Sequence, residues 1–182
     1  MEFPRSPVSY WASAKLIHWF VAAAVIALLA EGPVMKRLVP EGSLRDNLYT
    51  FHEALGALVL IVMVVRLARR IAFGVPAPDA SMPPIEQHAS LWAQYALYVL
   101  LFITTVLGWA GTNAYGDPVS VFGLFDFPAI LAKDQPLSDR IYLWHLICGI
   151  LIGGIVALHI AGALYHWLIK GDRVLQRVLP GN

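Results

Sequence analysis

Cysteine and charge are both scarce in this chain of 182 residues. Its single cysteine, Cys148, excludes an internal disulfide, and the absence of a Cys-x-x-Cys-His motif excludes the usual covalent attachment of a haem. Only 14% of the residues are charged, whereas a soluble domain carries about a quarter. Gly-rich phosphate loops, nucleophile elbows and carboxylate dyads are also missing, and the basic residues do not indicate a nucleic-acid partner. These absences argue against a soluble enzyme and favour a membrane protein.

Apolar residues, in contrast, make up 58% of the chain and gather in four long runs. Each run is long enough to cross a hydrocarbon layer about 30 Å thick. We expect helices over about 14–35, 51–73, 88–112 and 141–169, with a long outer loop over 113–140. The sequence therefore predicts an all-α fold, a single integral membrane domain over 1–182 that forms a four-helix bundle in contact with lipid.

Basic residues predict the orientation of this bundle. Eight lie in the N-terminal segment, the connection after the second helix and the C-terminal tail, whereas five lie in the two opposite loops. Because Lys and Arg are enriched on the cytoplasmic side, both termini are expected in the cytoplasm and the two loops outside. The first group comprises Arg5, Lys15, Arg66, Arg69, Arg70, Lys170, Arg173 and Arg177, and the second comprises Lys36, Arg37, Arg45, Lys133 and Arg140.

Four histidines lie inside the apolar runs, where an ionisable side chain is costly and usually functional. His145 and His159 are fourteen residues apart, which places them on one helix face at depths that differ by roughly 21 Å. The directions of the other helices put His52 at the outer level with His145, and His18 at the inner level with His159. Each level thus receives two histidines from two different helices.

Two histidines at one level are too few for a zinc site, which needs a third or fourth strong ligand. Glu53 adjoins His52, but consecutive helical positions point about 100° apart. An iron porphyrin needs only two axial ligands from the protein, so two non-covalent haems b in the bundle core fit the pattern best. The expected ligand pairs are His18 with His159 and His52 with His145.

Several neighbours of the histidines support this hypothesis but allow a second interpretation. Gly56, Gly149 and Gly162 each follow a histidine by about one turn, which makes room for a flat ring or for close helix packing. Arg66 returns to the face of His52 at the inner level, where it would pair with a haem propionate or extend to lipid headgroups. His166 would donate to a propionate or a quinone carbonyl, or remain a solvated side chain.

With these motifs in this order, the chain resembles the bacterial cytochrome b-561 family, the four-helix di-haem b-type cytochromes that include superoxide oxidase. The resemblance covers essentially the whole chain. It implies two haems b, ligated by His18 with His159 and by His52 with His145, and electron exchange with a quinone, most simply ubiquinone. The motifs are Leu16-Ile17-His18-Trp19, Phe51-His52-Glu53-Ala54-Leu55-Gly56, Val62-Met63-Val64-Val65-Arg66-Leu67, Tyr142-Leu143-Trp144-His145 and Leu158-His159-Ile160-Ala161-Gly162-Ala163-Leu164-Tyr165-His166.

Two functional hypotheses follow. The first is a bacterial inner-membrane redox protein, with oxidoreductase activity, that moves electrons between an outer donor or acceptor, superoxide among the candidates, and the quinone pool. The second is a haem-containing membrane anchor and electron conduit for a partner dehydrogenase or hydrogenase. The outer side carries eight acidic against five basic residues, a balance that does not favour attraction of the superoxide anion.

Overall fold

The computed structural model describes residues 10–78 and 82–180. This part of the chain contains four long α-helices: α1 (Ala12–Arg37), α2 (Ser43–Phe73), α3 (Pro84–Tyr115) and α4 (Gln135–Tyr165). The last helix continues into a π-helical turn, η1 (His166–Lys170). The described residues form no β-strand, only an isolated bridge between Ser120 and Asp126. The all-α prediction is confirmed.

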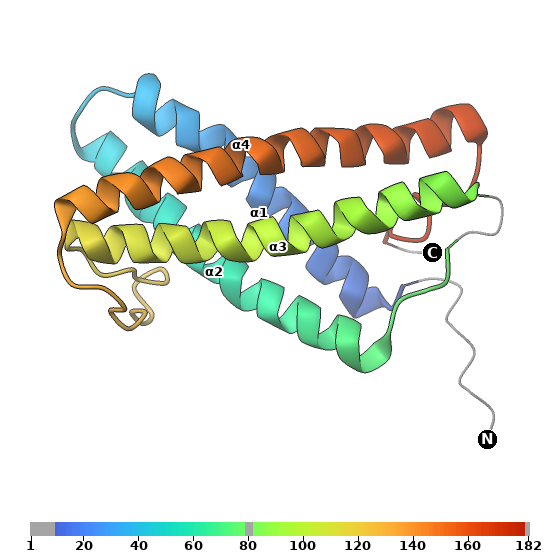
Figure 1. Cartoon of the computed structure of the whole chain (residues 1–182), viewed down its shortest axis with the longest axis horizontal. Coiled ribbons are helices and arrows are strands. Elements are labelled where there is room, and N and C mark those ends of the chain that lie inside the picture. The colour runs from blue at the N-terminus through green and yellow to red at the C-terminus, as the bar shows by residue number, and fades with distance from the viewer. Residues whose placement is uncertain (1–9, 79–81, 181–182) are drawn as a thin grey trace.

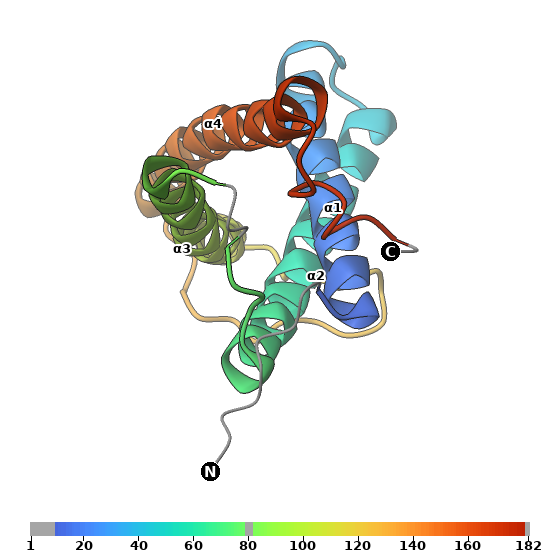
Figure 2. The same cartoon turned by 90° about the vertical axis from the view of Figure 1, so that its right-hand side faces the viewer.

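The helices associate in two pairs. α1 packs along α2 and α3 packs along α4, and α2 also contacts α3. Figure 1 shows the α1–α2 pair inclined across the α3–α4 pair, and Figure 2 shows the two pairs on opposite sides of the bundle. In the described part of the chain, α1 and α4 have almost no close backbone approach.

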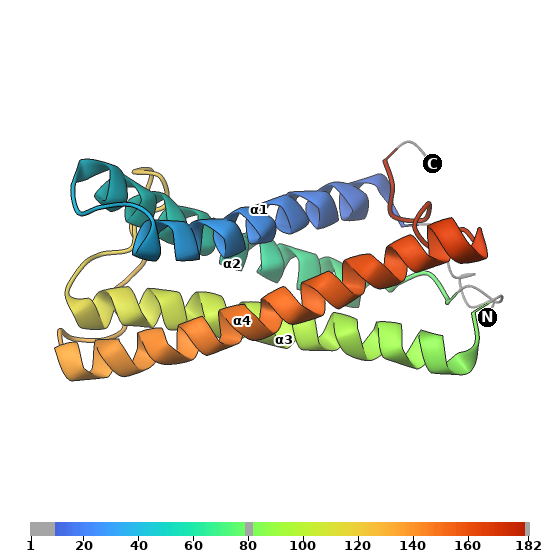
Figure 3. The ribbon, with the colours of Figure 1, turned by 90° about the horizontal axis from the view of Figure 1, so that it is seen from above.

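The bundle has two ends, which we distinguish by their connections (Figure 3). The loop end carries the connections 38–42 and 116–134. The terminal end carries the start of α1, the end of α2, the start of α3 and the segment 171–180. Here Trp19 Nε1 donates to the Val178 carbonyl at 2.8 Å, and Arg177 donates to the Ala77 carbonyl at 2.6 Å. These bonds hold the C-terminal segment against the terminal end. Arg5, which contributed to the predicted orientation, lies outside the described residues.

The helices extend beyond the apolar runs of the sequence. α2 begins at Ser43 rather than near 51, and α4 begins at Gln135 rather than near 141. The α4 start is fixed by Asp134, whose side chain accepts a hydrogen bond from the Leu137 N–H at 3.0 Å. At the other side of the long loop, α3 ends at Gly116, which adopts the left-handed conformation (φ 116°) that glycine tolerates. The loop is thus shorter than predicted, 116–134.

Each of the four helices is long and apolar enough to cross a membrane. Large apolar side chains cover their outer surfaces: Ile71 is 76% exposed, Leu158 74% and Ile169 72%. A soluble protein rarely exposes apolar patches of this extent, whereas lipid solvates them. The fold is therefore a membrane-spanning four-helix bundle, as expected from the sequence.

An apolar layer fills the middle of the bundle. Val59 and Met63 of α2 are fully buried, and they pack with Val21 and Val25 of α1 and Ile152 of α4. Along α2 this layer follows His52 and precedes Arg66, and along α1 it follows His18. The layer thus separates the histidines near the loop end from those near the terminal end.

Candidate cofactor sites in the bundle

His52 of α2 and His145 of α4 face each other at the loop end. Their ring centroids are 6.1 Å apart and their planes are inclined by 67°. An imidazole nitrogen lies about 2.0–2.1 Å from a bound metal ion, so two rings on opposite sides of one ion have centroids roughly 6 Å apart. The structure brings together the two histidines expected at the outer level, at a separation that suits one metal between them.

The orientation of His145 is fixed by α3. Its Nδ1 lies 2.9 Å from the Thr104 carbonyl oxygen, and because a carbonyl only accepts, Nδ1–H is the donor. The lone pair of Nε2 is then free to ligate a metal. Gly108 lies beside the ring, where a Cβ would be 3.2 Å from His145 Cε1. α3 contributes no histidine to this site, yet it holds one in place.

His52 has a partner that the sequence did not reveal. Its Nδ1 lies 3.6 Å from Oε2 of Glu31, on α1. Both atoms are buried, and neither has a hydrogen-bond partner among the described residues. All four helices thus meet around the loop-end pair: α2 and α4 contribute the histidines, α3 a carbonyl and α1 a carboxylate.

At the terminal end, His18 of α1 and His159 of α4 lie within electrostatic range of each other and of Arg66. Arg66 Nη2 donates to His18 Nδ1 at 2.9 Å, and its guanidinium lies 5.5 Å from the centre of the Tyr98 ring. Arg66 is therefore turned into the bundle beside the histidines rather than extended toward lipid headgroups.

The structure does not bring His166 to this group. The ring is buried, with Nδ1 hydrogen-bonded to Asp172 and Nε2 at 3.5 Å from Glu86 Oε2. Lys170 pairs with the same Glu86 carboxylate at 2.6 Å. Both nitrogens of His166 are thus directed at carboxylates, one from Glu86 at the start of α3 and one from Asp172 in the segment after η1.

Glu53 also points away from the histidines. It accepts a hydrogen bond from Thr112 Oγ1 at 3.2 Å, and Tyr142 lies 3.3 Å from the same hydroxyl. Over the described ranges, no three or more His, Cys, Asp or Glu side chains form a group that could hold a metal ion. The histidines therefore occur as pairs, which suit a macrocycle that supplies the remaining ligands.

The three predicted glycines have open space where a side chain would stand. A Cβ built on Gly56, Gly149 or Gly162 would meet no side chain within 4 Å. Close helix packing, the second interpretation of these glycines, would place a neighbouring atom there. Gly56 and Gly149 are half-buried beside the facing histidines, so the open space at these two glycines fits a haem b at the loop end; Gly162 is exposed and gives no such evidence.

A comparison with known protein families identifies the chain. The model of the prokaryotic cytochrome b561 family matches residues 9–181. The chain belongs to this family. It is therefore a multi-pass membrane protein that binds haem b and transfers electrons, which confirms the resemblance found in the sequence.

Individual relatives cover the same length. Cytochrome b561 homolog 2 of Escherichia coli is 30% identical over 98% of this chain and 95% of the relative. A probable superoxide oxidase of Yersinia pestis is 23% identical over 90% of this chain and 92% of its own. Cytochrome b562 of Cereibacter sphaeroides is 26% identical over 90% of both chains. The similarity to each of these relatives thus covers at least 90% of this chain.

Proposed function

We propose that this member of the cytochrome b561 family holds two haems b and passes electrons between a small redox partner at its loop end and a membrane quinone. His52 and His145 would hold the haem at the loop end, and His18 and His159 the haem at the terminal end. Arg66 would bind a propionate of the second haem. The observation that carries the proposal is the 6.1 Å juxtaposition of His52 and His145 from separate helices.

A haem b with two histidine ligands supplies one-electron transfer and has no open coordination position for a substrate. Electron donors and acceptors must therefore contact the protein near the edges of the cofactors. The apolar layer of Val59, Met63 and Ile152 excludes water between the two sites. The chain's role is to hold the two ligand pairs on opposite sides of this layer.

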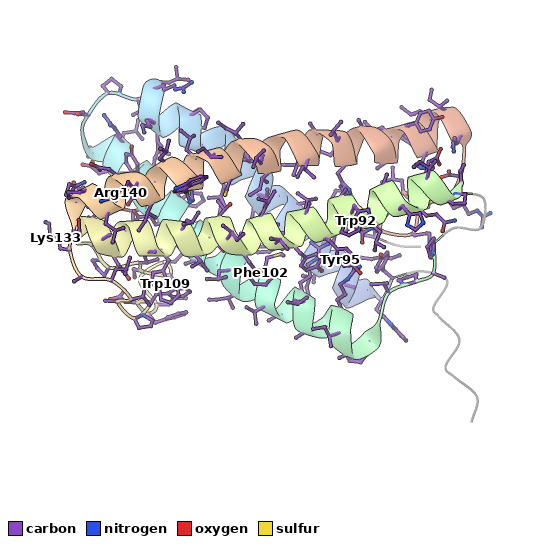
Figure 4. All side chains as sticks on the ribbon, viewed as in Figure 1. Trp92, Tyr95, Phe102, Trp109, Lys133 and Arg140 are labelled. Atoms are coloured by element: carbon purple, nitrogen blue, oxygen red, sulfur yellow. The ribbon has the colours of Figure 1, made fainter. Side chains whose placement is uncertain are left out.

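Superoxide is our candidate partner at the loop end, on the basis of the relative with that printed name. Two superoxide anions would give up one electron each and leave as dioxygen, while one quinone takes both electrons and two protons to become quinol. Two of the eight acids assigned to this side, Glu31 and Glu53, turn into the bundle. Six acidic and five basic residues of this side thus remain at the surface. This charge repels an anion less than the eight acidic and five basic residues counted from the sequence would. Figure 4 shows two of the bases, Lys133 and Arg140, at this end.

We further propose that the protein resides in a bacterial inner membrane with its terminal end in the cytoplasm. The excess of basic residues at that end supports this orientation. Superoxide or another outer partner would then meet the loop-end site, and electrons would cross toward the cytoplasmic half of the membrane.

Haem stoichiometry tests the core of the proposal. The purified protein should contain two haems b per chain by pyridine haemochrome. Replacement of His52 or His145 by Ala should remove one haem, and replacement of His18 or His159 should remove the other. The optical spectrum of the haem that is retained should differ between the two groups of variants. Fewer than two haems in a fully loaded preparation, or four substitutions that all leave both haems, would contradict it.

Stopped-flow reduction distinguishes the partners. Rapid haem reduction by superoxide, followed by reoxidation with quinone, is the expected result. Reduction only by quinol would remove superoxide from the proposal. A stoichiometric dehydrogenase or hydrogenase that copurifies without crosslinking would instead support the second hypothesis, a membrane anchor that conducts electrons for a partner.

A further inference from the structure

The contact between Glu31 and His52 joins α1 to a haem-ligand pair that is otherwise formed by α2 and α4. The Glu31 carboxylate approaches the ring on the Nδ1 side, at 3.6 Å. The side chains are 10% and 18% exposed respectively. Neither atom has a hydrogen-bond partner among the described residues, and at 3.6 Å the two lie just beyond hydrogen-bond distance of each other. A carboxylate oxygen and a ring nitrogen that are both buried and face each other at this distance are placed to interact.

The two ligands of the loop-end pair are held in different ways. His145 Nδ1 donates to a backbone carbonyl, which carries only a partial charge. His52 Nδ1 faces a side chain that carries a full negative charge when ionised. A carboxylate that accepts from the Nδ1–H of a ligand histidine fixes the tautomer and makes the metal-binding nitrogen a stronger donor.

We propose that Glu31 is a positioning residue for the loop-end haem: it orients His52 for iron ligation and, through its charge, lowers the reduction potential of that haem. The inference rests on the proposed function, since it assumes that His52 is an iron ligand. A more basic axial histidine and a nearby negative charge both stabilise the oxidised iron relative to the reduced iron. The loop-end haem is thereby made the better electron donor.

The proposal separates into two roles that different substitutions distinguish. Glu31→Gln keeps a carbonyl oxygen that accepts from His52 Nδ1–H but removes the charge. Glu31→Leu removes both the acceptor and the charge. Glu31→Asp keeps the charge on a shorter side chain and serves as the conservative rescue.

A matched control is available on the same side of the bundle. Glu41 lies in the 38–42 connection, its side chain is 93% exposed, and it pairs with Arg45 at 3.5 Å. Glu41→Gln changes the net charge of the loop end by the same amount as Glu31→Gln. It does so in solvent, away from the histidines, where the effect of a charge is screened.

The experiment is a spectroelectrochemical titration of the purified holoprotein and its variants. The titration of the native protein should resolve two redox components, one for each haem. The component that is absent in His52→Ala or His145→Ala belongs to the loop-end haem. Glu31→Gln should keep both haems and shift this component alone to higher potential, with a changed low-spin EPR signal. Glu31→Asp should lie closer to the native protein, and Glu41→Gln should leave both components in place. Glu31→Leu should weaken retention of the loop-end haem by about 10–100-fold.

Three results would overturn the inference. Glu31→Gln could leave the loop-end component where it is, or shift the two haems equally, or Glu41→Gln could produce the same shift. Each of these outcomes leaves the two-haem proposal intact, because the haem count of the native protein is measured separately. A native preparation with fewer than two haems would instead defeat the proposed function.

Discussion

Three of the four histidines are distinguished by what their Nδ1 atoms contact. His145 Nδ1 donates to a carbonyl and His52 Nδ1 faces a carboxylate, so both can present Nε2 to a metal. His18 Nδ1 instead accepts from Arg66, which favours a proton on Nε2. Ligation of iron by His18 through Nε2 therefore requires Arg66 to give up this contact. A haem propionate is the anion that would attract the guanidinium away.

Arg66→Gln should consequently weaken the terminal-end haem. The change removes the charge that would hold a propionate, while the amide can still donate within the bundle. We expect retention of this haem to fall by about 10–100-fold, the usual cost of losing a partner that supports a metal site. Haem content after gel filtration, with optical spectra to identify the haem that is lost, measures the effect.

The control for Arg66 is Arg69, one turn further along α2. Its guanidinium lies 5.1 Å from the centre of the Phe73 ring, and within the described part of the chain His18 bonds to Arg66 rather than to Arg69. Arg69→Gln should leave both haems bound. Equal loss in the two variants would indicate a general effect of charge at the terminal end, and the specific role of Arg66 would be abandoned.

Gly149 offers a second prediction at the scale of a residue. A methyl group here meets no side chain of the bundle within 4 Å, and alanine normally stabilises a helix by roughly 0.5–1 kcal/mol relative to glycine. Gly149→Ala should nevertheless reduce haem content at the loop end, because the added methyl group would occupy space that the porphyrin needs. Haem quantification and thermal unfolding of the same preparation would separate the two effects.

Gly154 provides the matched substitution on the same helix. It is exposed, and a Cβ there also meets nothing within 4 Å. Gly154→Ala should keep the full haem content. Full haem content in Gly149→Ala as well would show that this glycine provides no room for the cofactor.

At the scale of the helices, hydrophobicity predicted where the chain crosses the membrane but not where each helix begins. The run near 51–73 is apolar, whereas the first turns of α2, from Ser43, carry Arg45, Asp46 and Asn47. Leu44, Leu48 and Phe51 recur at helical spacing through these turns, but the polar residues between them interrupt the long apolar run by which the membrane span was predicted. The end of α3 was similarly underestimated, although Gly116 is the kind of residue that ends a helix.

Asp134 is the residue that sets the start of α4, and its removal should be measurable. Asp134→Ala deprives the Leu137 N–H of its acceptor, a loss that costs about 1 kcal/mol in a typical helix. A fall of roughly 2–4 °C in the unfolding midpoint in detergent is expected for a chain of this size. Asp134→Asn, which keeps an acceptor oxygen, should restore most of the midpoint. An unchanged midpoint in Asp134→Ala would show that the cap contributes nothing.

Residue spacing along the helices predicted which histidines lie at the same depth, but not which side chains of neighbouring helices surround them. The spacing of His145 and His159 and the directions of the helices were enough to place His52 opposite His145, and the structure agrees. Glu31 and the Thr104 carbonyl were not predicted, because both depend on how α1 and α3 pack around the histidines. Glu31 was counted among the outer acids, and a backbone carbonyl leaves no trace in a sequence. The roles of all four histidines as haem ligands stay predictions.

On the scale of the whole molecule, the two candidate sites lie on either side of an apolar layer and each is accompanied by charge of a different sign. The loop-end pair has Glu31, and the terminal-end pair has Arg66. A negative charge near a haem stabilises the oxidised iron and so lowers the reduction potential. A positive charge stabilises the reduced iron and so raises it. Electron flow from the loop end to the terminal end is the direction that this asymmetry favours.

Electron flow in this direction would carry electrons inward across the membrane only if the loop end faces outward. Cysteine labelling tests this orientation. The native Cys148 is buried, so the unmodified protein should resist a membrane-impermeant maleimide. Leu124→Cys, at a loop position that is 81% exposed, should be labelled in intact spheroplasts. Arg173→Cys, at an exposed position of the terminal end, should be labelled only after lysis, because the basic excess predicts that this end lies in the cytoplasm. The reverse pattern would invert the protein in the membrane and place superoxide chemistry on the cytoplasmic side.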